Sequence, residues 1–85
     1  MESLVEKVQK ILTRRFPPPA RIDVEDEDGI LGSVVSSEFR GMPTIDRVNA
    51  IWNTLDRALT PAERRRVLMI VAVTPDEELI HTHNV

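Results

Sequence analysis

The sequence predicts a single small α+β domain with elements in the order αββααβ, a short helical turn at the end, and a mixed three-stranded sheet with helices packed on one face. Three observations predict this fold class. Apolar residues recur at helical spacing in residues 4–12 and again in residues 45–59. Between them, an alternating segment leads into Asp28-Gly29, which is typical of a β-hairpin. Residues 67–73 are uncharged and β-branched at several positions, as in a buried strand.

The first helix is predicted to end before three consecutive prolines at residues 17–19. Its acidic residues come early, and Arg14 and Arg15 come late, as the helix dipole favours. The apolar stripe of this helix consists of Leu4, Val5, Val8, Ile11 and Leu12. Because proline cannot continue a helix, the prolines should form an extended connector to the hairpin.

The hairpin is predicted from two strands joined by an acidic tip. Residues 21–25 alternate polar and apolar side chains, so one face of this strand should be buried. Residues 30–36 form the returning strand, in which Gly32 indicates a bulge or the close approach of another group. The acidic run from Asp23 to Asp28 does not fit an EF-hand loop. We interpret it as a solvated tip that discourages edge-to-edge aggregation.

Two helices are predicted in the second half of the chain. The apolar stripe of the longer one consists of Ile45, Val48, Ile51, Trp52, Leu55 and Leu59. This stripe should pack Trp52 toward the sheet, whereas Asp46 and Arg47 should face solvent or hold the neighbouring loop. Thr60-Pro61-Ala62-Glu63 is a capping box with proline at the first helical position, so a short helix should begin there and end at three arginines.

The last strand, residues 67–73, lacks alternation, which predicts a central strand or one covered on both faces. The helix pair before it predicts a parallel pairing with the second strand. Thr74-Pro75-Asp76-Glu77 repeats the capping-box pattern and should begin a last helical turn. Residues 81–85 contain His81 and His83 without periodicity. We therefore expect one domain at residues 1–80 and a flexible tail at 81–85 rather than a metal site.

Composition excludes several classes of function. The chain has 85 residues, no cysteine and a net charge of −3. Disulfides, zinc–thiolate sites and cysteine-ligated clusters built from this chain alone are therefore excluded. No apolar run is long enough to span a bilayer and no secretory signal is visible, so we expect a cytoplasmic protein. No nucleophile with a base partner and no buried carboxylate pair is recognisable, so we expect no enzyme and no catalytic residues.

Three segments in order carry a family resemblance: Ser36-Ser37-Glu38-Phe39-x-Gly41, Arg47-Val48-Asn49-Ala50-Ile51-Trp52-x-x-Leu55 and Thr74-Pro75-Asp76-Glu77. Together they resemble the signature of the BolA-like proteins, whose fold is similar to the type II KH domain. The resemblance extends from about Ile22 to Glu77. Val48 stands where the motif of that family has histidine.

The resemblance implies a partner and a cofactor, but several residues of this chain differ from the ligands of the family. BolA-like proteins associate with monothiol glutaredoxins and share an iron–sulfur cluster through histidine or cysteine ligands. The position of the ligand histidine at the start of the third strand corresponds to about Arg66. The position of the second ligand, in the hairpin loop, corresponds to Asp26, Glu27 and Asp28. Carboxylates are poor ligands for such a cluster. We therefore expect a non-catalytic adaptor or regulator of the stress-response type, acting through protein contacts with no cofactor or metal ligand in this chain.

Two alternatives stay open. The first is a KH-like nucleic-acid-binding regulator whose contact residues, also the candidate contacts for a protein partner, are Arg40, Arg47, Arg64, Arg65 and Arg66. Against it, residues 58–61 lack the glycines of the KH clamp, Gly29-Ile30-Leu31-Gly32 lies on the hairpin, and the net charge is negative. The second is a small oligomeric subunit that uses an exposed sheet face or the edge strand at residues 21–25.

Overall fold

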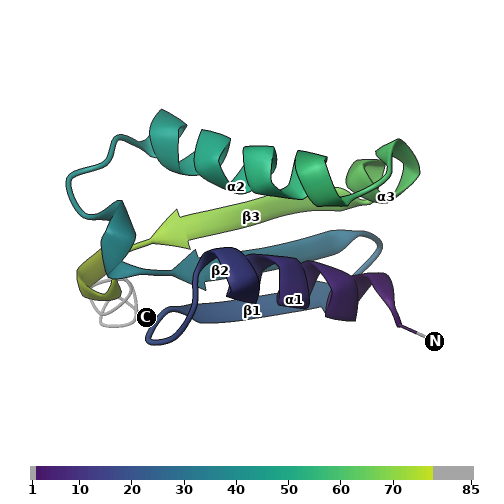
Figure 1. The fold of residues 1–85 in the computed structure, drawn as a ribbon, viewed down its shortest axis with the longest axis horizontal. Helices are drawn as coiled ribbons and strands as arrows, with labels where there is room; N and C mark the ends of the chain where they lie inside the picture. Colours follow the sequence, from purple (N-terminus) through teal and green to yellow (C-terminus); the bar gives the residue numbers. More distant parts are fainter. Residues whose placement is uncertain (1, 78–85) are drawn as a thin grey trace.

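The computed structural model describes residues 2–77 and confirms the α+β class and the order of elements (Figure 1). The elements are α1 (Leu4–Arg15), β1 (Arg21–Asp26), β2 (Ile30–Val35), a 3-10 turn (Ser37–Phe39), α2 (Thr44–Ala58), α3 (Pro61–Arg65) and β3 (Val67–Val73). Residues 75–77 begin a further helical turn. The predicted tail with His81 and His83 lies outside the described residues.

The sheet is mixed and its order is β1-β2-β3. β1 and β2 pair antiparallel with Arg21 opposite Val35, and β2 and β3 pair parallel, as predicted. The hairpin turn depends on Asp28 and Gly29, which have φ angles of 56° and 137°. Glycine readily adopts the φ angle found at Gly29. The turn predicted from Asp28-Gly29 is therefore confirmed.

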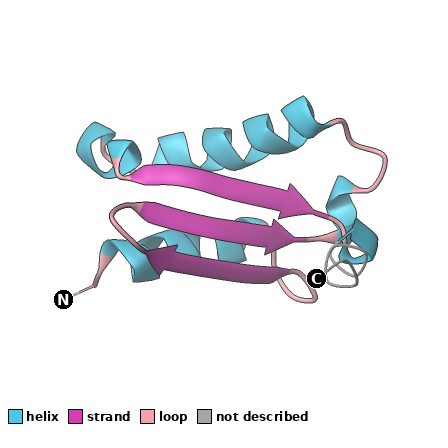
Figure 2. Cartoon of the chain, turned by 180° about the vertical axis from the view of Figure 1, so that it is seen from behind, coloured by secondary structure: helices cyan, strands magenta, loops and turns pink. Residues whose placement is uncertain are grey.

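Both long helices lie on one face of the sheet, and Figure 2 shows the other face without any helix over it. α1 packs against β1 and α2, whereas α2 packs against α1 and β3. The buried core between helices and sheet consists of Val8, Leu12, Phe16, Ile30, Val34, Phe39, Ile51, Leu55, Leu59, Val67 and Ile70. Alternate residues of each strand therefore face either this core or the uncovered face. No described helix is long and apolar enough to cross a membrane.

The prediction for β3 was wrong in its position. β3 pairs only with β2 among the described strands and forms an edge of the sheet, whereas β2 is central. The missing alternation has a local cause, because the register with β2 skips Leu68 at a bulge. Leu68 and Met69 are each 57% exposed and Val71 is 44% exposed. The strand is thus uncharged without being covered on both faces.

The apolar stripe of α2 is wider than the surface that the sheet offers it. Ile51, Leu55 and Leu59 are buried as predicted, but Ile45 in the first turn is 64% exposed. Trp52 is only half-buried, and the Arg64 guanidinium lies 4.0 Å from the centre of its ring. Trp52 therefore closes the margin of the core by a cation–π contact instead of filling the centre.

We predict that Phe39→Ala lowers the free energy of unfolding by about 3–5 kcal/mol, because it removes a fully buried ring that packs 5.3 Å from the ring of Phe16. Urea denaturation followed by circular dichroism measures the change. The matched control is Asn53→Ala on the exposed side of α2, which should stay within about 0.5 kcal/mol. Equal effects of the two substitutions would contradict this account of the core.

Candidate functional site

The hairpin turn and the start of β3 form the first candidate site. Parallel pairing places these two segments side by side, and the Ile30 N–H donates to the Arg66 carbonyl at 2.7 Å. The Arg66 side chain donates from Nη2 to Asp26 Oδ2 at 3.1 Å. A side-chain contact between residues 40 positions apart and a backbone hydrogen bond from Ile30 therefore join the same two segments.

A hollow of about 550 Å³ lies beside this ion pair. It is lined by Asp26, Asp28, Gly29, Arg65, Arg66 and Leu68. Gly29 contacts the exposed Leu68 side chain, and its φ angle of 137° is the feature that requires glycine here. The hollow combines carboxylates, guanidinium groups and one exposed leucine.

The two places for which the resemblance implies cluster ligands are neighbours in this structure, and both hold residues unsuited to that role. Arg66 has no lone pair to donate to a metal, and Asp26 is already paired with it. Within residues 2–77, no group of three or more histidine, cysteine, aspartate or glutamate side chains could hold a metal ion. The donor set at this site does not fit an iron–sulfur cluster.

Arg47 connects α2 to the far end of β3. Its Nε donates to the Met42 carbonyl at 2.8 Å and its Nη1 donates to the Ala72 carbonyl at 3.3 Å. Nη1 and Nη2 also reach the two carboxylate oxygens of Glu77 at 2.6 and 3.2 Å. The side chain is only 12% exposed. Of the two roles expected for Arg47, the structure shows the second, because Arg47 holds the neighbouring loop instead of facing solvent.

Glu77 is held from two sides. The Arg47 guanidinium, followed by the Thr74 backbone N–H, lowers the pKa of Glu77 from its ordinary value of 4.5 to about 2. The Thr74 hydroxyl accepts from the Glu77 N–H at 3.2 Å, which completes the predicted capping box. Glu77 therefore remains ionised throughout the physiological range and fixes the end of β3 to α2.

The five candidate arginines do not form one patch. Arg64, Arg65 and Arg66 lie at the start of β3, whereas Arg40 and Arg47 lie at its end, beside Asp76 and Glu77. A strand of seven residues separates the two groups by about 20 Å. Arg64 pairs with Asp56, and Arg66 pairs with Asp26. Only Arg65 among the five makes no ion pair within the described residues, so the basic cluster is largely neutralised by neighbouring carboxylates.

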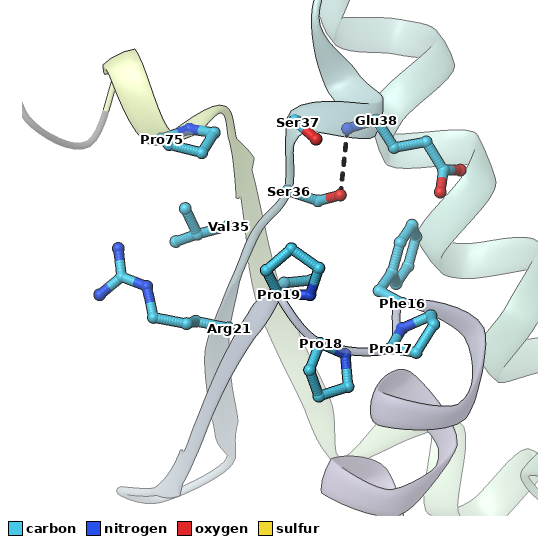
Figure 3. A pocket seen from close by; sticks show the side chains of 11 residues that line it. Phe16, Pro17, Pro18, Pro19, Arg21, Val35, Ser36, Ser37, Glu38 and Pro75 are labelled. Atoms are coloured by element: carbon cyan, nitrogen blue, oxygen red, sulfur yellow. Dashed lines mark hydrogen bonds between the residues drawn. The ribbon is translucent and has the colours of Figure 1, made fainter.

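A second hollow, of about 600 Å³, lies where the proline connector passes the ends of β2 and β3 (Figure 3). Its wall is formed mainly by apolar side chains, among them Pro17, Pro18, Pro19, Val35 and Pro75. The Glu38 carboxylate on its rim is already paired with Arg15, at 2.7 Å. The rim hydrogen bond from the Glu38 N–H to Ser36 Oγ belongs to the cap of the 3-10 turn. This hollow presents an apolar wall and no group poised for chemistry.

No family model and no curated protein matches the chain. The fold is similar to the solved structure of BolA1 from Arabidopsis thaliana, with a TM-score of 0.68 and 23% identity over 91% of this chain and 98% of that one. The chain therefore has the BolA-like fold. The structure of the XC975 protein is also similar, with a TM-score of 0.56 and 30% identity over 89% of this chain and 94% of that one.

The BolA-like motif residues have structural roles in this chain. Ser36 caps the 3-10 turn, since its side chain accepts from the Glu38 N–H at 3.1 Å. Phe39 is fully buried, and Gly41 has a φ angle of 76°, which favours glycine. The motif therefore forms the connection from β2 to α2. It specifies the BolA-like fold without specifying a reaction.

Sequence reasoning missed the exposed apolar residues of this BolA-like protein. Ile45 was expected in the core, and Leu68, Met69 and Val71 were expected in a covered strand. The sequence pointed the other way. Strand β1 carries the charged residues of an edge strand, whereas β3 carries none, although both strands are edges.

We predict that acid destabilises the protein partly through Glu77. Because the pKa of Glu77 is lowered in the folded state, its stabilising contribution is complete above pH 4.5 and is lost as the pH falls toward about 2. Glu77→Gln should therefore reduce the slope of unfolding free energy against pH in this window. Denaturation series at several pH values measure it, and Glu27→Gln at the exposed hairpin tip is the control. Identical slopes for native protein and Glu77→Gln would contradict the assignment.

Proposed function

We propose that this BolA-like protein is a non-catalytic adaptor or regulator that acts through contacts with another protein and supplies no ligand to an iron–sulfur cluster. The observation that carries the proposal is the Asp26–Arg66 ion pair at the place where the resemblance implies cluster ligands. A monothiol glutaredoxin is the proposed partner, because the fold is BolA-like.

The chemistry of the ion pair supports the loss of ligation. An arginine side chain stays protonated at any physiological pH, so Arg66 cannot become a ligand by losing a proton. Its fixed positive charge also disfavours a metal cation in the same hollow. Asp26 could act as an oxygen ligand only after leaving Arg66, and oxygen ligands suit harder ions than the iron of a thiolate-bound cluster.

The surface beside the ion pair supports protein contact. Leu68 is 57% exposed at the rim of the hollow, and Arg65 next to it makes no ion pair among residues 2–77. An exposed leucine next to an available arginine is a combination that protein interfaces use, since arginine and apolar side chains are both common in their centres. A protein partner could therefore recognise the shape, the charge and the apolar area of this hollow without a cofactor.

We predict that the native protein and a monothiol glutaredoxin form a complex without cluster ligands from this chain. Reconstitution with iron and sulfide, followed by size-exclusion chromatography, metal analysis and visible absorbance of the complex, measures this. Arg66→His should introduce an imidazole and change the visible spectrum of the complex, whereas the matched control Arg65→His should not. A native complex whose cluster is ligated by this chain would refute the proposal, as would the absence of any complex.

We also predict that nucleic acid is not the partner. Carboxylates pair with Arg40, Arg47, Arg64 and Arg66, which lowers the positive potential that counterion release requires. Fluorescence anisotropy with single-stranded RNA and duplex DNA at two salt concentrations should detect no salt-sensitive binding at micromolar protein. Salt-sensitive binding that is lost in Arg65→Glu would instead favour the KH-like alternative.

A further inference from the structure

Within residues 2–77, the large exposed hydrophobic residues are confined to two elements. The large hydrophobic side chains that are exposed in the described chain are Ile45, Leu68, Met69 and Val71. All of them belong to α2 or β3, and none belongs to α1, β1 or β2. Three of these four side chains belong to β3, so the exposed apolar residues gather mainly on this edge strand.

The two edges of the sheet have opposite chemistry. On the uncovered face, β1 presents Arg21, Asp23 and Glu25, and charges of this kind protect an edge from pairing with another strand. Over its seven residues, β3 contains no charge and no proline. In this respect β3 resembles β2, which has a hydrogen-bonded strand on either side. The composition of β3 is that of an interior strand, although it lies at an edge.

The backbone of β3 offers hydrogen-bonding groups at this edge. The Val73 carbonyl accepts from the Ser36 N–H, so Val73 and Val71 direct their backbone groups toward β2. Alternation along the strand then directs the N–H and C=O groups of Ile70 and Ala72 away from β2. The Ala72 carbonyl already accepts a hydrogen bond from Arg47 Nη1. The Ile70 N–H and C=O have no partner among residues 2–77.

We propose that β3 pairs antiparallel with β3 of a second copy of this chain and joins the two sheets into one six-stranded sheet. The inference is independent of the proposed function. In this register Ile70 faces Ile70 of the second copy, and each supplies one N–H and one C=O to the other across a two-fold axis. Met69 then faces Val71 of the second copy on the uncovered face, where such cross-strand apolar pairs stabilise a sheet.

Charge favours a second copy in antiparallel orientation. The start of β3 is flanked by Arg65, which makes no ion pair among residues 2–77, and its end is flanked by Asp76, which pairs with Arg40 at 3.0 Å. Antiparallel pairing brings Arg65 of one copy toward the Asp76–Arg40 pair of the other, whereas parallel pairing would place Arg65 beside Arg65. β3 itself contributes no charge to oppose its own copy. Figure 2 shows α2 along the outer side of β3, so pairing also brings the two α2 helices toward each other.

Self-association is tested first by sedimentation velocity from micromolar to millimolar concentration. The native protein should form a dimer. Val71→Lys places a charge opposite Met69 of the second copy and should weaken dimerisation by at least about tenfold. Because Val71 is already 44% exposed, the fold should persist, which circular dichroism verifies. The matched control Glu25→Lys, on the same face at the opposite edge, should leave the dimer intact.

The register is tested by cross-linking, since the chain has no cysteine of its own. Met69→Cys mixed with Val71→Cys should give a disulfide-linked dimer under mild oxidation, because facing residues of a non-hydrogen-bonded antiparallel pair have Cα atoms about 4.5 Å apart, within disulfide range. Glu25→Cys mixed with Val71→Cys should give none.

A strictly monomeric native protein at millimolar concentration would overturn the proposal. A dimer that resists Val71→Lys, or that cross-links through Glu25→Cys, would overturn it as well. Binding of β3 only to an extended segment of another protein would do the same. Each of these outcomes would leave the Asp26–Arg66 site and its cluster experiment untouched.

Discussion

The structure depends on one constraint: two helices cover one face of a three-stranded sheet, and no described element covers the other face. The hydrophobic core therefore lies in a single layer between helices and sheet, and Val8, Leu12, Phe39 and Leu55 are fully buried there. A chain of this size has too little apolar surface to build a second layer. The uncovered face and the β3 edge are consequences of this shortage, and they are where the chain has surface left for partners.

Two similar devices hold β3 at its two ends. Before the strand, Glu63 closes the capping box of Thr60 and also accepts from Lys7 Nζ at 2.8 Å, and these hydrogen bonds lower the pKa of Glu63. After it, Glu77 does the same with Thr74 and Arg47. Each glutamate thus serves a local cap and a contact distant in the chain. Exposed ion pairs contribute little singly, but here each one fixes the direction of a strand end.

Local signals in the sequence predicted most of the fold. The prolines ended α1, Asp28-Gly29 made the turn, and two capping boxes marked the helix starts, because each of these effects acts within a few residues. The exposure of β3 and the distant contacts of Arg47 were not predictable in the same way. The run of apolar residues in β3 was interpreted as burial, because its bulge at Leu68 depends on the register with β2, which is distant in the sequence. The targets of Arg47 on Ala72 and Glu77 lie 25 and 30 positions further along the chain. A polar residue beside an apolar stripe looks solvent-facing until such a distant acceptor is known.

The resemblance separates in the same manner into a part that specifies fold and a part that specifies chemistry. Ser36, Phe39 and Gly41 form the connection from β2 to α2, and this structural role involves no cluster. Val48 follows Arg47, at the end of β3 opposite to Arg66, so the histidine it replaces in the motif would not join the hairpin site. At the places where the resemblance implies ligands, Asp26 and Arg66 form an ion pair. The fold of this chain is therefore BolA-like. Its own chemistry lies in the ion pairs on the surface at the two ends of β3.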